Sequence, residues 1–189
     1  LLSFHKEADP VQVLVCGQLR IALATGDVPL RSALEQIEIR FLVSKLITLS
    51  QALKTDFGIS SPKIAVMGVN PHSGSMPTGD DEKVVKAVGD AQQKGLFAFG
   101  PFSASQLFAA GMWKKYDAVM AMHYEQGVFP MKFLSTEGYA YYWAGLPVVC
   151  AAPLHGPAYD IANQNKAIPD SYRKAVFLAA DVVGHRREQ

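Results

Sequence analysis

Several side chains suited to binding a metal ion or moving a proton follow directly after apolar runs of the sequence. Histidine and carboxylate ligands from separate loops suit a divalent metal such as zinc, and histidine also titrates near neutral pH. The sequence has no His-x-x-x-His or Cys-x-x-Cys pair, so the alternative for each candidate is an isolated loop position. The candidates are Asp27, His72, His123, Tyr124, Glu125 and His155. If the strands that they follow are neighbours, we expect these residues to converge on one edge of the sheet.

His72 stands in the most informative of these segments. The apolar residues 64–67 predict a buried strand, which ends at Gly68 because the following Asn70-Pro71 pair cannot continue a central strand. In a parallel sheet, ligands bind at the loops that leave the carboxyl ends of the strands. We therefore expect His72 at such a site; the alternative is a turn histidine exposed to water.

The elements that must position these side chains alternate along the chain. A hairpin is predicted from the strands 11–16 and 19–24, and further strands from 64–67, 96–99, 117–122, 139–143 and 147–152. Helical spacing of apolar residues predicts one long helix or two joined helices over 31–57, and helices over 80–95, 103–110 and 171–184. The segment 123–127 is expected to be a loop, and the segment from 133 is ambiguous. This alternation predicts an α/β fold with helices layered on a sheet.

Two further groups could contact a ligand. Lys132 lies between Met131 and Phe133, and a lysine in apolar company can bind a phosphate or carboxylate, although its ammonium group can also simply reach water. The aromatic residues of 139–143 could stack on a ring, or they could form a packed or interface strand. Glycine-rich nucleotide motifs and a Gly-x-Ser-x-Gly elbow are absent from the sequence.

The composition limits the class of protein. Of 189 residues, 49% are hydrophobic and 19% charged, enough apolar material for one α/β domain or one domain and part of another. The net charge of +1 argues against nucleic acid or an anionic membrane as the main partner, and no apolar run has membrane-spanning length. Cys16 and Cys150 are expected to be buried thiols, which suits a reducing, cytoplasmic compartment. The chain starts without a methionine or a secretory signal, so we expect it to begin in mid-protein.

Eight runs of sequence, taken in order, resemble one family. They are LRIALAT from 19, PLR from 29, GVNPHSG from 68, GPF from 100, DAVMAM from 117, QG from 126, GLP from 145 and HGPAYDIA from 155. Each run alone is weakly specific, but together they cover nearly the whole chain. The sequence resembles the 4-hydroxythreonine-4-phosphate dehydrogenases of pyridoxal phosphate biosynthesis, as a diverged member that lacks the N-terminal part.

This resemblance implies a three-layer α/β/α fold like that of isocitrate and isopropylmalate dehydrogenases, in a homodimer whose subunits share the active-site cleft. Residues 1–150 would form the central α/β domain, and 151–189 would return towards the missing N-terminal domain. The family oxidises a secondary alcohol with NAD, and the β-keto acid so formed loses carbon dioxide. A divalent metal (zinc, magnesium or cobalt) held by three histidines acts as a Lewis acid.

The resemblance also implies positions for the ligands, and several are changed in this chain. The three metal histidines fall on Asp27, His72 and Tyr124, with His123 one place before the third. A carboxylate can still bind a hard or borderline metal, whereas a shift of one residue at a strand end turns a side chain to the other face.

The substrate contacts of the family fall on Lys132, which is kept, and on Tyr141 and Cys150, which replace an asparagine and an arginine. Cysteine cannot replace arginine as a bidentate ligand for an anion. Three hypotheses therefore stay open. The chain could be an NAD-dependent dehydrogenase of this family, with Lys132 binding substrate or moving a proton. It could be a non-catalytic module for small-molecule binding or assembly. It could also be a related dehydrogenase for an unphosphorylated hydroxy acid, because its pocket is less cationic.

Overall fold

The computed structural model of the chain describes residues 9–109, 111–135, 138–155 and 159–188. Residues 1–8 and residues 156–158 of the matching run from 155 lie outside these ranges. The strands are β1 (Val11–Cys16), β2 (Leu19–Leu23), β3 (Lys63–Met67), β4 (Phe97–Phe102), β5 (Ala118–Ala121), β6 (Ala140–Ala144) and β7 (Ala151–Pro153). The α-helices are α1 (Leu30–Gln36), α2 (Ile39–Thr55), α3 (Asp80–Gln93), α4 (Ala104–Ala109), α5 (Tyr124–Leu134) and α6 (Asp170–Arg187), with short 3₁₀ helices at Met112–Lys115 and Tyr159–Ile161.

The strands form one seven-stranded sheet in the order β4-β3-β5-β2-β1-β6-β7. β5 lies between β2 and β3 and is parallel to both, and β4 is parallel to β3. The strands β1, β6 and β7 continue the sheet by antiparallel pairing from β2 outward. The carboxyl ends of β2, β3, β4 and β5 therefore meet at one edge of the sheet.

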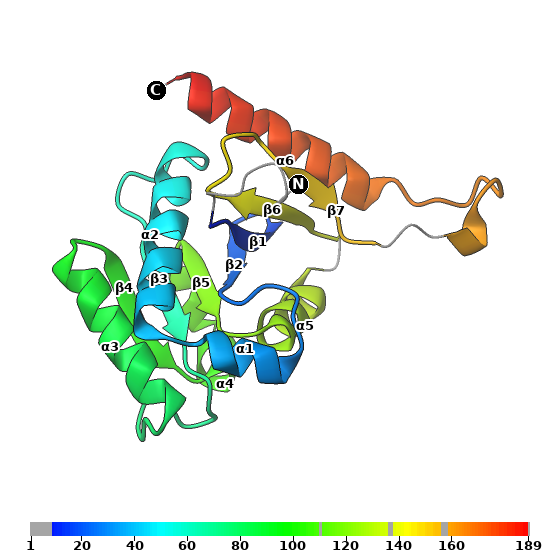
Figure 1. Cartoon of the computed structure of the whole chain (residues 1–189). Coiled ribbons are helices and arrows are strands. Elements are labelled where there is room, and N and C mark those ends of the chain that lie inside the picture. The colour runs from blue at the N-terminus through cyan, green and yellow to red at the C-terminus, as the bar shows by residue number, and fades with distance from the viewer. Residues whose placement is uncertain (1–8, 110, 136–137, 156–158, 189) are drawn as a thin grey trace.

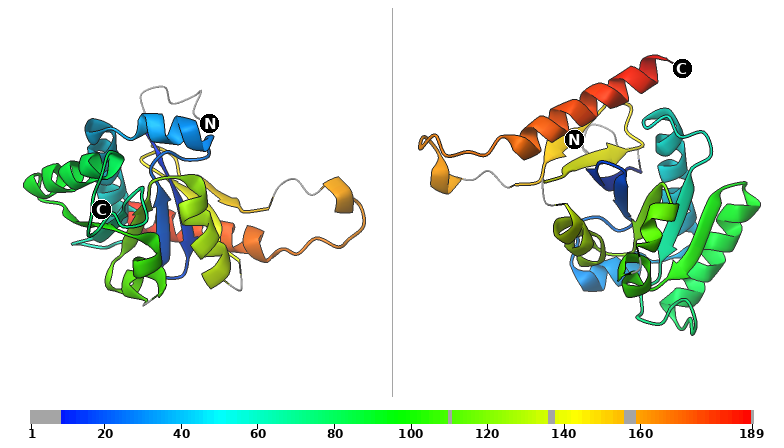
Figure 2. Two further views of the ribbon diagram at one scale, coloured as in Figure 1. Left: turned by 90° about the horizontal axis from the view of Figure 1, so that it is seen from below. Right: turned by 180° about the vertical axis from the view of Figure 1, so that it is seen from behind.

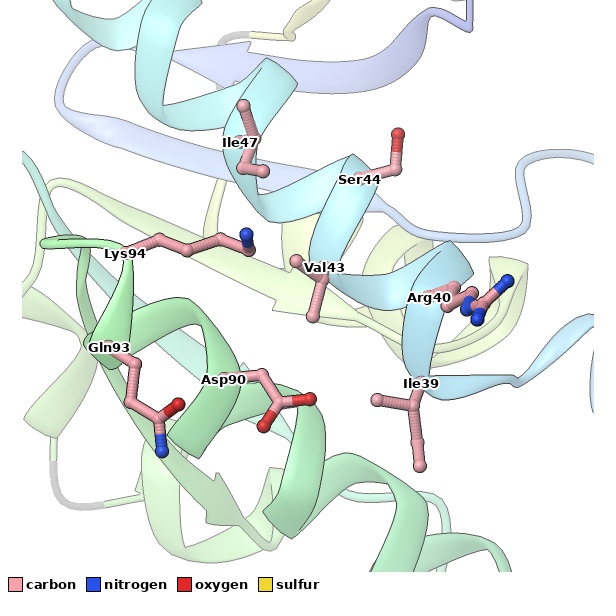
Figure 3. Close-up of a pocket in the computed structure, with 8 residues that line it drawn as sticks. All are labelled: Ile39, Arg40, Val43, Ser44, Ile47, Asp90, Gln93 and Lys94. Carbon is pink, nitrogen blue, oxygen red and sulfur yellow. The ribbon is translucent and has the colours of Figure 1, made fainter.

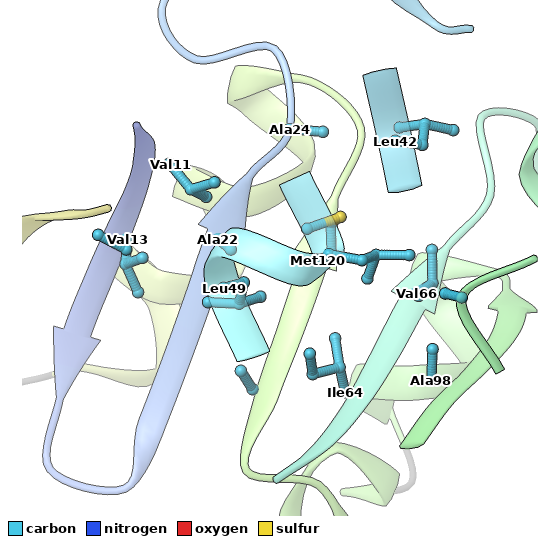
Figure 4. Packing of buried hydrophobic residues seen from close by; sticks show 14 of the residues in the cluster. Val11, Val13, Ala22, Ala24, Leu42, Leu49, Ile64, Val66, Ala98 and Met120 are labelled. Atoms are coloured by element: carbon cyan, nitrogen blue, oxygen red, sulfur yellow. The ribbon is translucent and has the colours of Figure 1, made fainter. Parts of the chain in front are cut away.

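Helices cover both faces of the sheet and make three layers (Figure 1). Alternate side chains of a strand point to opposite faces, so each strand contributes to two cores. On one face, side chains of the strands pack against α2 and α3, as Figure 4 shows for Leu49, Ile64 and Met120. On the other face, Ile21 and Val119 pack with residues of α4 and α5. The predicted α/β/α architecture is confirmed.

A buried ionic network joins α6 to the rest of the fold. The carboxylate of Asp56, directly after α2, accepts hydrogen bonds from Arg186 Nε at 2.6 Å and from the Tyr142 hydroxyl at 2.5 Å. A second Arg186 nitrogen, Nη2, lies 3.2 Å from the other carboxylate oxygen. The network therefore connects α2, β6 and α6, of which α6 lies along β6 and β7 in both views of Figure 2.

Two sequence predictions need correction. The predicted loop 123–127 is wrong, because α5 begins at Tyr124. This helix is hard to predict from the sequence because it contains Gly127 and Pro130. Gly127 packs against Leu23, and a Cβ atom at position 127 would overlap the Leu23 side chain. The strand predicted over 147–152 is reduced to the three residues of β7. For the region 31–57, the alternative of two joined helices is confirmed, and they meet near Glu38.

The state of the two cysteines and the length of the helices can be compared with the predictions. Cys16 and Cys150 are free thiols, as expected, but both are half-buried rather than buried. Among the described residues, no helix is both long and apolar enough to cross a membrane.

Candidate functional site

The loops that carry Asp27, His72 and His123 leave neighbouring strands at the same edge of the sheet. The chain continues from β2 and β3 to helices on one face, and from β5 to α5 on the other face. In open α/β sheets, ligands bind outside the carboxyl ends of strands whose following helices lie on opposite faces. The prediction that these three strand ends converge is confirmed by the strand order.

The loop that carries His72 is held by a buried carboxylate. Asp81, in the first turn of α3, accepts hydrogen bonds from Val69 N at 2.7 Å, Asn70 N at 3.3 Å and Asn70 Nδ2 at 2.6 Å. Position 68 must be glycine, because a Cβ atom there would lie 2.7 Å from Asp81 Oδ1 and would overlap Ser73. The α3 N-terminus favours the negative charge of this carboxylate.

Two more polar side chains connect the three loops. Gln126, in the first turn of α5, accepts a hydrogen bond from Met122 N and donates one to Gly68 O, each at 2.7 Å. Thr25 Oγ1 donates to Met122 O at 2.9 Å. The backbone just before His123 is therefore tied to the loop after β2 and to the loop after β3. Sequence analysis missed Thr25, Asp81 and Gln126, although the match of Gln126 to the QG run was a signal for one of them.

His72 is exposed and lines a cavity of about 580 Å³ between its own loop and the start of α4. The other walls come from Gly100 to Ser103 and from Gln106. The neighbouring Ser73 hydroxyl is buried and has no hydrogen-bond partner among the described residues. His72 thus has space for a ligand beside it.

Tyr124, Tyr141 and Asp27 form the second part of the site. The hydroxyls of Tyr124 and Tyr141 lie 3.3 Å apart. Burial is the main cause that raises the pKa of Tyr141, with the hydrogen bond to Tyr124 next and the charge of Asp27 a smaller influence. Tyr139 lies beside this pair, and its buried hydroxyl has no partner among the described residues. The structure therefore brings together a candidate metal ligand and a candidate substrate ligand through their phenol groups.

His123 is half-buried at the position that precedes α5. Burial lowers its pKa, and the carboxylate of Glu125 opposes this with a smaller effect. The imidazole is accordingly neutral at pH 7 and can accept a proton or a hydrogen bond.

This environment makes a prediction for titration. The His123 ring should titrate below the usual 6.5 of a histidine, as measured by its NMR proton shifts, and the assignment is made with His123→Gln. The unfolded chain binds the proton of His123 more tightly than the folded chain does. Ionisation of His123 should therefore lower the stability of the protein as the pH falls below the pKa that this residue has in the unfolded chain. A midpoint above 6.5 would contradict the burial of this ring.

The remaining candidates are Lys132, Cys150 and His155. Lys132 is exposed on α5, and Cys150 is half-buried just before β7, where burial raises the pKa of its thiol. His155 follows β7, which pairs with β6 so that Pro153 is opposite Ala140. Because β7 runs against β2, His155 lies at the opposite edge of the sheet from Asp27, and its expected convergence with the other loops is wrong.

The described residues do not by themselves assemble a metal site. Within the described ranges, no three His, Cys, Asp or Glu side chains gather closely enough to hold one. The assignment of Asp27, His72, His123 and Tyr124 as metal ligands stays a prediction, and we derive no chemical step through a metal.

A second groove lies between α2 and α3, with a volume of about 640 Å³ (Figure 3). It is lined by Arg40 and Lys94 as well as Asp90 and by apolar side chains of α2. The lining residues belong to α2 and α3, apart from Lys94, which directly follows α3. None of them comes from the strand ends that carry the candidate site. We assign it no role.

The fold and the sheet-edge site define an α/β protein of the isocitrate/isopropylmalate dehydrogenase-like class. Two solved structures of this kind match it closely. The 4-hydroxythreonine-4-phosphate dehydrogenase from Klebsiella pneumoniae has a TM-score of 0.84 at 29% identity, and a putative one from Salmonella typhimurium has 0.85 at 31%. Each alignment covers 96% of this chain and 56% of the other. The family model for the pyridoxal phosphate biosynthetic protein PdxA matches residues 1–179, and the chain belongs to this family.

Curated relatives agree with this family. The 4-hydroxythreonine-4-phosphate dehydrogenase of Bacteroides thetaiotaomicron is 36% identical over 182 residues, which is 95% of this chain and 50% of that protein. The chain therefore spans about half the length of such relatives. A structure described as a terephthalate 1,2-cis-dihydrodiol dehydrogenase from Burkholderia xenovorans also matches, with a TM-score of 0.72 at 28% identity.

Proposed function

We propose that the chain supplies one wall of the active site of an NAD-dependent dehydrogenase in pyridoxal phosphate biosynthesis. The reaction would be oxidation, with decarboxylation, of 4-phosphohydroxy-L-threonine or a related hydroxy acid. The observation that carries the proposal is the family match over residues 1–179, together with the shared edge at which β2, β3 and β5 end. Cytoplasmic location follows as part of the same proposal.

The residues of this chain can be given roles in that reaction. Oxidation of a secondary alcohol transfers its hydride to the nicotinamide and its hydroxyl proton to a base. His123 is suited to accept the proton because its lowered pKa keeps it neutral at pH 7. Lys132, exposed on α5, would bind an anionic group of the substrate or move a proton, and Tyr141 would donate a hydrogen bond through its neutral hydroxyl. Cys150 would contact the substrate as a neutral thiol.

We also propose that the protein is a homodimer and that the second copy covers the outer face of α5. Phe129 and Phe133 are 68% and 78% exposed there and stack on each other at 6.5 Å. They border a groove of about 550 Å³ between α4 and α5 that is lined mainly by apolar side chains. Because α5 begins beside the site, a partner on this face would lie close to it. Residues 1–150 would then form the central domain, and 151–189 would return towards the additional half found in the relatives.

NADH formation by the purified chain with NAD⁺ and 4-phosphohydroxy-L-threonine tests the dehydrogenase. We expect turnover that falls at least about tenfold in Lys132→Ala, because a charge-assisted contact to an anion is lost. Lys114→Ala, on the remote 3₁₀ helix, is the matched control and should keep full activity. A chain that forms no NADH and is not stabilised by either compound would refute the proposal.

The second candidate function is a non-catalytic binding module. It is favoured by the replaced ligands at Asp27, Tyr124 and Cys150. Thermal stabilisation by NAD⁺ and substrate without NADH formation would identify this function. Turnover of an unphosphorylated hydroxy acid or cis-diol in preference to the phosphorylated substrate would instead indicate that the less cationic pocket has changed the substrate specificity.

A further inference from the structure

A second cavity, of about 510 Å³, lies at the opposite edge of the sheet from the candidate site. Its walls come from the β1–β2 turn, from the end of α2 and from one side of α6. Figure 1 shows α6 passing the end of α2, whereas α1 lies at the other end of α2. This volume is within the range of sites for small molecules.

Arg20 is the notable charge in this cavity. Its Nη1 donates to the carbonyl oxygens of Gln18 at 3.2 Å and Asp117 at 3.3 Å. Its Nε is buried and has no hydrogen-bond partner, and among the described residues no carboxylate lies within ion-pair distance of the guanidinium. The group lies over the ring of Phe57, 4.8 Å from its centroid. Burial lowers the pKa of Arg20, with the charge of Asp117 a smaller, opposite influence.

The other ionisable groups of the cavity leave this charge unbalanced. Lys174 Nζ donates to Gly138 O at 3.0 Å, and His185 Nδ1 lies 2.9 Å from Asp56 O. The Asp56 carboxylate is occupied by Arg186 and Tyr142. Asp181 is exposed, so water screens its charge. Arg20 is half-buried, and its partly desolvated guanidinium without a carboxylate carries a cost that an anionic ligand would reduce.

We propose that this cavity binds a small carboxylic acid with an apolar body. Nη1 is already used by backbone carbonyls and Nε is enclosed, so Nη2 is the guanidinium nitrogen left to donate a charge-assisted hydrogen bond to a carboxylate in the cavity. The remaining walls are mostly apolar and suit a hydrocarbon or aromatic body. They include Val15, Phe57, Phe177, Leu178 and Val182.

Isothermal titration of the chain with benzoate tests the proposal, with benzamide as the uncharged analogue of the same shape. We expect benzoate to bind and benzamide to bind at least about tenfold more weakly. In Arg20→Met the Kd for benzoate should rise at least about tenfold. Arg40→Met, which removes an arginine from the groove between α2 and α3, is the control and should leave the Kd unchanged.

Because Arg20 also donates to two backbone carbonyls, Arg20→Met could affect folding. A second pair of variants therefore tests the cavity without changing Arg20. Phe177 is 60% exposed at the cavity wall, so Phe177→Glu should fold and should repel benzoate. Tyr172→Glu, at an exposed position of the same helix outside the cavity, should not. Equal binding of benzoate and benzamide, equal binding by Phe177→Glu and Tyr172→Glu, or inorganic phosphate binding as tightly as benzoate would each overturn the proposal.

Discussion

Replacement of Asp56 by alanine is expected to lower the free energy of unfolding by about 3 kcal/mol. The side chain of Asp56 is 2% exposed, and its carboxylate accepts hydrogen bonds from Arg186 and from the buried hydroxyl of Tyr142. The variant leaves that hydroxyl without an acceptor and Arg186 without its counter-charge. Since Arg186 is 25% exposed, it can still reach water, and the loss should lie at the lower end of the range for broken buried ion pairs.

Urea denaturation of the purified variants measures this loss. Arg187→Ala is the matched control, because Arg187 is the exposed neighbour of Arg186 on α6 and should change stability by less than about 0.5 kcal/mol. A double-mutant cycle with Arg186→Met should give a coupling energy of about 1–3 kcal/mol between the two charges. A loss below about 1 kcal/mol in Asp56→Ala would show that this network does not hold α6 in place.

The central part of the fold was predictable because its strands carry strong signals. The runs at 64–67 and 117–122 are apolar on both faces, which is typical of central parallel strands, and the structure places β3 and β5 there. The hairpin of β1 and β2 was equally clear from its short turn. In contrast, α5 carries Gly127 and Pro130, and its helical pattern is short. The packing of Gly127 on Leu23 favours the helix, and this contact joins residues far apart in the sequence, so a local sequence pattern cannot indicate it.

The candidate site was predictable in position but not in detail. Polar residues after strands can be found in the sequence, and Asp27, His72 and His123 do share one edge of the sheet. His155 also follows a strand, but it lies at the opposite edge of the sheet from Asp27. The end of a strand predicts the edge only when the direction of the strand is known, and β7 runs antiparallel to β6 and to β2. The contact between Tyr124 and Tyr141 depends on α5 lying beside β6, which only the folded chain reveals.

The changed residues alter the charge of the site in one direction. The resemblance places histidines at the positions of Asp27 and Tyr124 and an arginine at that of Cys150, so each change removes a group able to carry positive charge. Neutral phenols at Tyr124 and Tyr141 now occupy the space beside Asp27. Under the proposed function, this part of the site would bind an anionic substrate less strongly, and Lys132 would be the main cation on α5 for a substrate phosphate.

Replacement of Asp81 by alanine is expected to disorder the loop that carries His72 and to cost about 3 kcal/mol of stability. The side chain is fully buried, and it accepts three hydrogen bonds from Val69 and Asn70, the segment that leads from β3 to His72. Hydrogen bonds to a charged acceptor contribute about 1.5–3 kcal/mol each, but losses within one network are not additive. Because Gln126 joins Gly68 to Met122, the disorder should extend towards His123.

Hydrogen exchange separates this local effect from general destabilisation. The amides of Val69 and Asn70 should exchange faster in Asp81→Ala than the overall stability of the variant explains, whereas amides in β1 should not. Asp81→Asn keeps one acceptor oxygen and should lose about half as much stability. Asp80→Ala removes the same charge from the same turn, but Asp80 is half-buried and forms an ion pair with Lys83, so its loss should be below about 1 kcal/mol. If Asp80→Ala and Asp81→Ala had equal effects, the charge at the start of α3 would explain both, and the buried hydrogen bonds would not be what positions His72.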